Sequence, residues 1–66
     1  MENIVEQLRK ENGISQEAFA KAMCVSRQTI SSIENGKYNP ALELVFLISN
    51  YFNKSIEEIF IYNKKE

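Results

Sequence analysis

The sequence predicts an all-α fold of five short helices, and three observations support this prediction. Apolar residues recur at helical spacing along most of the chain, residues suited to cap helices stand between these stretches, and no alternation of apolar and polar residues is long enough to indicate a strand. A chain of 66 residues forms one domain. Such a chain buries only about 60% of the surface that its unfolded form exposes. We therefore expect a single compact domain over residues 1–66 with mostly local contacts.

Two helices are predicted in the first third of the chain. The first covers about residues 2–12 and ends before Gly13, which can adopt the left-handed conformation that often follows a helix. The second begins after Ser15, a favourable N-cap, and has Glu17 near the positive end of its dipole. The apolar faces consist of Ile4, Val5 and Leu8 in the first helix and Phe19, Ala20 and Met23 in the second.

The third and fourth helices are predicted in the middle of the chain. Ser26 caps the third, which ends where Asn35 and Gly36 can turn. The fourth covers about residues 40–52, because Asn39 is a good cap and Pro40 is tolerated at the first helical position. One face of it carries Leu42, Val45, Ile48 and Phe52, and the face is widened by Leu44, Phe46, Leu47 and Tyr51. A helix apolar nearly all round is central or covered by a partner.

The last helix is predicted from a capping box. Ser55 and Glu58, three residues apart, can each satisfy a backbone N–H group of the other. The apolar residues of this helix are Ile56, Ile59 and Phe60. We expect the charged tail at 63–66 to fray, with Lys64 and Lys65 as a solvated end.

The composition excludes several classes of function. The chain has no histidine, one cysteine and two glycines. These counts exclude histidine-based triads, a zinc site of several Cys or His ligands, a disulfide framework and a phosphate-cradling glycine loop, so we expect no enzyme and no cofactor. The longest apolar run, Leu44–Ile48, is far shorter than the ~20 residues that span a bilayer, and we expect a soluble cytoplasmic protein.

The stretch from Gln16 to Asn35 has the outline of a helix-turn-helix. It holds two helix-sized segments separated by a break that leaves room only for a tight turn. If Ile30 and Ile33 define the inward side of the second segment, an advance of about 100° per residue places the outward side on Gln28, Ser31, Ser32 and Asn35.

A polar outward side is common on surface helices, but this one is made of unusual residues. Ser, Arg, Gln and Thr are weaker helix formers than the Glu, Lys and Ala that a solvated face favours. In the major groove, Gln can pair with adenine and Arg with guanine, while Ser accepts several bases. The composition of this side therefore favours contact with DNA bases over contact with water alone.

The net charge of −1 is unusual for a nucleic-acid binder, but the charges are unevenly distributed. Between Lys21 and Tyr38 the chain carries Lys21, Arg27 and Lys37 against Glu34, and the other acidic residues lie outside. We expect weak non-specific binding and a larger share of affinity from uncharged hydrogen bonds and dimerisation.

From about Ile4 to Phe60 the chain resembles the Cro/C1-type helix-turn-helix regulators, also called the XRE family, which include the phage repressors. The resemblance is densest in SQEAFAKAM, VSRQTISSIENGKYNP and SIEEIF. It implies a compact five-helix bundle of the phage-repressor type, with the helix-turn-helix formed by the second and third helices, and a DNA-binding transcriptional regulator.

The resemblance also implies roles for individual residues. The positions that read bases match Arg27, Gln28, Ser31 and Ser32, and those that contact the phosphate backbone match Gln16, Ser26, Thr29, Asn35, Lys37 and Tyr38. Gln16 would also brace the recognition helix, and Arg9 and Glu34 match an internal salt bridge, which we interpret as structural. Cys24 stands where many family members have glycine, which implies backbone strain of about 1 kcal/mol. We interpret its thiol as a partly buried, inert group and not as a redox sensor.

We expect a repressor that binds an inverted-repeat operator in double-stranded DNA as a homodimer. The C-terminal region has more bulky apolar residues than the core of so small a domain can hold, so we assign Phe60, Ile61 and Tyr62 to the dimer interface. Two recognition helices related by a two-fold axis would read half-sites ~34 Å apart. The alternative is a protein-interaction module, such as an antitoxin-like partner with secondary DNA binding.

Overall fold

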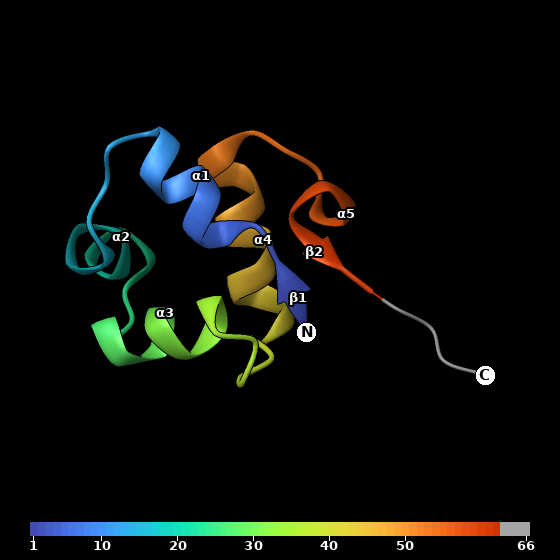
Figure 1. The fold of residues 1–66 in the computed structure, drawn as a ribbon, viewed down its shortest axis with the longest axis horizontal. Helices are drawn as coiled ribbons and strands as arrows, with labels where there is room; N and C mark the ends of the chain where they lie inside the picture. The colour runs from blue at the N-terminus through green and yellow to red at the C-terminus, as the bar shows by residue number, and fades with distance from the viewer. Residues whose placement is uncertain (63–66) are drawn as a thin grey trace.

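The computed structural model describes residues 1–62, which form five α-helices around one core and a short two-stranded sheet (Figure 1). The helices are α1 (Val5–Glu11), α2 (Gln16–Met23), α3 (Arg27–Glu34), α4 (Leu42–Phe52) and α5 (Ile56–Ile59), and the strands are β1 (Glu2–Asn3) and β2 (Phe60–Ile61). The five-helix fold class is therefore confirmed. The predicted frayed tail at 63–66 lies outside the described residues.

Helices α2 and α3 form the predicted helix-turn-helix. The hydroxyl of Ser15 accepts a hydrogen bond from the Ala18 N–H at 3.0 Å, and that of Ser26 accepts from the Thr29 N–H at 3.1 Å. Each serine thus satisfies one of the N–H groups that a helix start leaves without an intrahelical partner. Between the helices, Cys24 has φ 62 and ψ 38, the left-handed conformation that a glycine would adopt freely.

The prediction of helix from residue 2 and of no strand was wrong at the ends of the described chain. Glu2 pairs with Ile61 and Asn3 pairs with Phe60 in an antiparallel ladder, so α1 begins only at Val5 and Phe60 belongs to β2 instead of the last helix. A strand of two residues is too short to show alternation, and its pairing joins segments far apart in the sequence.

The predicted start and inward face of the fourth helix were also wrong in part. The N-cap of α4 is Ala41, which makes no side-chain cap, and Asn39 and Pro40 precede the helix. Leu42 is 69% exposed, whereas Leu44 and Ile48 are buried. Helix α4 packs against both α2 and α5, so its buried residues, Leu44 and Ile48, are those that face these two helices. Leu42 faces away from them.

The core holds side chains from every helix. The fully buried ones are Val5 of α1, Phe19 of α2, Ile30 and Ile33 of α3, Ile48 of α4 and Ile59 of α5. Burial of each of these side chains stabilises the fold by about 1.5–3 kcal/mol relative to leaving it exposed. Since Ile30 and Ile33 anchor α3 in this core, they also determine which side of α3 faces outward. No helix within residues 1–62 is long and apolar enough to cross a membrane.

Candidate nucleic-acid interface

The outward side of α3 carries the residues that were predicted to read bases. Arg27 and Gln28 are exposed, Ser31 and Ser32 are half-buried, and the core residues Ile30 and Ile33 lie on the opposite side of the helix. Figure 1 shows α3 along the lower edge of the molecule, with α1 and α2 above it in this view. An exposed helix at an edge is free to enter a groove of a partner molecule.

A shallow depression of about 240 Å³ lies at the start of α3. It is lined by Ser26, Gln28, Thr29, Ser32 and Tyr38. The hydroxyl oxygens of Ser26 and Thr29 are 2.9 Å apart, within hydrogen-bonding distance. Amide and hydroxyl groups both donate and accept hydrogen bonds, so the depression can satisfy base edges as well as phosphate oxygens. It brings together two of the predicted base readers and three of the predicted phosphate-binding residues.

The turn after α3 carries Tyr38 of this depression and two further predicted phosphate contacts, Asn35 and Lys37. Asn35, Lys37 and Tyr38 are all exposed. Gly36, with φ 76, reverses the chain between them, and its N–H donates to the Ile33 carbonyl at 3.0 Å. The Lys37 N–H donates to the Ser32 carbonyl at 3.0 Å, which keeps this turn close to the base-reading side.

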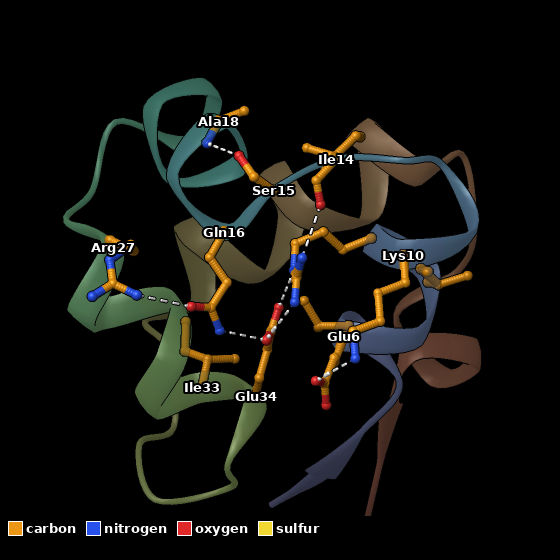
Figure 2. Close-up of polar contacts among 12 residues, drawn as sticks. Glu6, Lys10, Ile14, Ser15, Gln16, Ala18, Arg27, Ile33 and Glu34 are labelled. Carbon is orange, nitrogen blue, oxygen red and sulfur yellow. Dashed lines mark hydrogen bonds and ion pairs between the residues drawn. The ribbon is translucent and has the colours of Figure 1, made fainter.

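A hydrogen-bonded chain joins three helices beneath this surface (Figure 2). Arg9 Nε of α1 donates to Glu34 Oε2 at 2.8 Å, and Gln16 Nε2 of α2 donates to Glu34 Oε1 at 2.9 Å. Arg27 Nη1 of α3 then donates to Gln16 Oε1 at 3.2 Å. The internal salt bridge implied by the resemblance is thus present, and it continues outward to a phosphate-binding candidate and a base-reading candidate. The resemblance implied that Gln16 braces α3, and these two hydrogen bonds do so, but it did not name Glu34 and Arg27 as the partners.

The salt bridge changes the charge of the surface. The Glu34 side chain is 2% exposed and faces the Arg9 guanidinium, whose pKa is raised above its usual value by the hydrogen bond to Glu34. Arg9 neutralises the charge of Glu34. Residues 16–38 then carry three other positive charges, on Lys21, Arg27 and Lys37, and one other negative charge, on Glu17 at the start of α2.

The structure corrects one residue of the predicted dimer interface. Phe60 is only 7% exposed, because it packs into the core of its own protomer, whereas Ile61 and Tyr62 are 39% and 75% exposed. Four residues that were predicted to belong to the apolar face of the fourth helix are also exposed, namely Leu42, Phe46, Leu47 and Tyr51. The expectation that Cys24 is partly buried was wrong as well, since it is exposed at the turn.

Sequence reasoning missed one candidate residue, Asn3. Its side chain lies between the start of α1 and the end of α3, donating to the Ile33 carbonyl at 2.9 Å and accepting from the Val5 N–H at 3.0 Å. The available signal was an asparagine just before the first apolar residues, which is typical of a helix start. The predicted helix from residue 2 obscured it.

Comparisons with known proteins agree with this geometry. A helix-turn-helix family model matches residues 5–59. An uncharacterized HTH-type transcriptional regulator of Methanocaldococcus jannaschii is 47% identical over 66 residues, which cover all of both chains. Among solved structures, the restriction-modification controller protein C.AhdI of Aeromonas hydrophila has a TM-score of 0.75 at 25% identity and covers 85% of each chain. A transcriptional regulator from Listeria innocua has a TM-score of 0.81 at 24% identity, over 100% of this chain and 65% of its own.

The fold and the match together define the class of protein as a helix-turn-helix regulator. The chain belongs to the Cro/C1-type, or XRE, family of DNA-binding transcriptional regulators. Since the members of this family act by binding double-stranded DNA, the outward side of α3 is the candidate site for that contact.

Proposed function

We propose that this protein recognises a specific duplex sequence by placing α3 in the major groove. In this proposal Arg27, Gln28, Ser31 and Ser32 read base edges. The phosphate backbone is contacted by Gln16, Ser26 and Thr29 around the starts of α2 and α3, and by Asn35, Lys37 and Tyr38 in the turn after α3. The observation that carries the proposal is the outward side of α3, where Arg27 and Gln28 are exposed and Gln28 lines a depression together with the hydroxyl groups of the neighbouring residues.

We further propose that the protein is a repressor that binds an inverted repeat as a homodimer. Ile61 and Tyr62 supply an exposed apolar surface near the end of the described chain, with Leu42 and Phe46 on α4 as further exposed apolar residues. A single small domain contacts too few base pairs for high specificity, and a two-fold dimer doubles the number of contacts. Occupation of a promoter by such a dimer would block transcription.

Selection of bound sequences from a random duplex pool tests the proposal directly. We expect one enriched motif with two inverted half-sites about one helical turn apart. Recovery of no enriched sequence, even in dilute buffer, would remove the proposed reading role of α3.

Two substitutions then separate base reading from phosphate binding. Gln28→Ala should weaken binding to the selected duplex by ~1–3 kcal/mol and relax the preference at one base position. Lys37→Ala should weaken selected and random duplexes alike and lower the salt slope by ~1, because it removes a phosphate contact. Binding titrations at several salt concentrations measure both. An equal loss on both duplexes for Gln28→Ala would show that it does not read a base.

The second candidate function is a protein-interaction module, such as an antitoxin-like partner with secondary DNA binding. The observation that favours it is the exposure of Leu42 and Phe46 on α4, an apolar surface that another protein could cover. A neighbouring gene for a toxin-sized protein, whose product forms a stable complex with this one, would support this function over the first.

A further inference from the structure

The side chain of Asn3 joins the ends of two helices. Its Oδ1 accepts a hydrogen bond from the Val5 N–H at 3.0 Å, at the start of α1, and its Nδ2 donates to the Ile33 carbonyl at 2.9 Å, near the end of α3. Carboxamide groups are suited to this position because they donate on one side and accept on the other.

The Ile33 carbonyl lies in the last turn of α3, directly before the turn that carries the predicted phosphate contacts. This carbonyl also accepts from the Gly36 N–H at 3.0 Å, so Asn3 and the turn share one acceptor. The last carbonyls of a helix have no intrahelical donors and need such partners. A second contact supports the turn from the same segment, since the Met1 nitrogen donates to the Gly36 carbonyl at 3.1 Å.

On its other side, Asn3 is part of the sheet. It pairs with Phe60 in the β1–β2 ladder, and the next residue, Ile4, donates its N–H to the Ile59 carbonyl at 2.9 Å. Phe60 is buried in the core, which fixes the strand to the rest of the domain. Asn3 therefore connects the end of the recognition helix to an element that is itself anchored. β1 and β2 lie outside residues 5–59, the part that matches the family model.

We propose that Asn3 is a positioning residue for DNA recognition. By holding the Ile33 carbonyl to the sheet, it sets where the turn with Asn35 and Lys37 stands relative to Arg27 and Gln28. Without that link the two groups of DNA contacts would shift relative to each other, and both could not be made at full strength at the same time. This inference rests on the proposed function.

The variant Asn3→Asp isolates the donor role. Its carboxylate can still accept from the Val5 N–H, but it places an oxygen against the Ile33 carbonyl, where Nδ2 now donates. The variant Asn3→Ala removes these two hydrogen bonds, and a third that Nδ2 donates to the Met1 carbonyl at 3.3 Å, without adding charge. The matched control is Asn53→Asp, which adds the same charge at the exposed end of another helix, α4, where Asn53 makes the left-handed C-cap.

The test measures affinity for the selected duplex at a temperature where circular dichroism shows each variant to be folded. We expect both Asn3 variants to bind about 10-fold more weakly than the wild type. Both variants lose the hydrogen bond to the Ile33 carbonyl, and the loss occurs in each of the two protomers of the proposed dimer. Amide hydrogen exchange should become faster at Gly36 and Lys37. Asn53→Asp should bind within about 2-fold of the wild type, because a distant exposed charge is largely screened by salt.

The outcomes separate this inference from the proposed function. A wild type without preference for any duplex defeats the proposed function, and this inference falls with it. A wild type that binds its duplex, beside folded Asn3 variants that bind it equally well, defeats the inference alone. A residue that only adds stability would lower the melting temperature and leave the affinity of the folded protein unchanged. Failure of both Asn3 variants to fold would likewise overturn a positioning role, since Asn3 would then be required for the fold itself.

Discussion

At the scale of single residues, Glu34 connects the core with the DNA-facing surface. Its buried carboxylate accepts from Arg9 on one side and from Gln16 on the other. The resemblance to the family implied the first partner, and the position of Glu34 toward the inward side of α3 agrees with it. The resemblance implied that Gln16 braces α3 but not that it does so through Glu34, because the first residue of α2 reaches Glu34 only once the two helices have packed.

Glu34→Ala should lower the free energy of unfolding by ~3–5 kcal/mol, because it leaves the buried Arg9 guanidinium without its counter-charge. Urea denaturation followed by circular dichroism measures the change. The double variant Arg9→Met/Glu34→Leu is the control, and it should regain most of the loss, since apolar residues of similar size often replace a buried ion pair at little cost. Unchanged unfolding with lost DNA binding would instead make Glu34 a functional residue.

Cys24→Gly should stabilise the fold by about 1 kcal/mol, because glycine adopts φ 62 without the steric cost of a Cβ atom. Cys24→Ser keeps the Cβ atom and should not stabilise the fold.

Gly13→Ala is the reciprocal test. A Cβ atom at Gly13 would meet nothing within 4 Å, so the expected loss of about 1 kcal/mol would report its φ of 66 alone. Thermal unfolding compares the three variants, and no gain from Cys24→Gly would contradict strain at the turn.

At the scale of elements, the helices with strong local signals were predicted best. Serine caps precede α2, α3 and α5, and the apolar period of each is short and regular, so these helices start where the sequence indicated. The errors lie at α1 and α4. There, the true start depends on the pairing of Asn3 with Phe60 and on the packing of α4 between α2 and α5, which local patterns do not contain.

The capping box of α5 should make stability depend on pH. The Ser55 N–H donates to Glu58 Oε1 at 2.8 Å, and this backbone hydrogen bond is the main cause that holds the pKa of Glu58 below its usual value of 4.5. A lowered pKa in the folded state means that the stabilisation is complete above pH 4.5 and is lost as the pH falls below it. In Glu58→Gln, which has no carboxyl group at this position, the free energy of unfolding should fall less steeply as the pH is lowered. Chemical denaturation between pH 3 and 7, roughly the range over which carboxylates titrate, compares the two proteins, and parallel profiles would contradict the prediction.

At the scale of the whole molecule, the proposed homodimer requires a surface that two copies can share. The apolar residues exposed at β2 and α4 are more than a solitary domain needs, and the proposed operator requires a pair of recognition helices. Burial of Phe60 narrows the proposed C-terminal interface to Ile61 and Tyr62.

Ile61→Lys should turn the dimer into a monomer without disturbing the fold. A lysine at this position lies opposite Glu2 in the ladder, so the sheet gains an opposite charge, while a cation between two protomers is unfavourable. Sedimentation equilibrium should show a monomer at concentrations where the wild type is a dimer. Affinity for the full operator should fall by at least about 10-fold and affinity for one half-site should change little.

The control for this variant is Leu47→Lys, which also replaces an exposed apolar residue but lies on the side of α4 that faces Cys24 and Tyr38. It should remain a dimer. A wild type that stays monomeric at high concentration, with no dimer formed on DNA, would refute the homodimer.

The sequence by itself determined the helix-turn-helix and the outward side of α3. Both depend on caps and apolar spacing within about 20 residues, and such local preferences act whatever the rest of the chain does. Only the tertiary structure decided that Phe60 is buried, that Leu42 is exposed, and that the side chains of Asn3 and Gln16 both bond to the last turn of α3, at Ile33 and Glu34. These features depend on contacts between segments distant in sequence, and a pattern of residue types does not specify which distant groups meet.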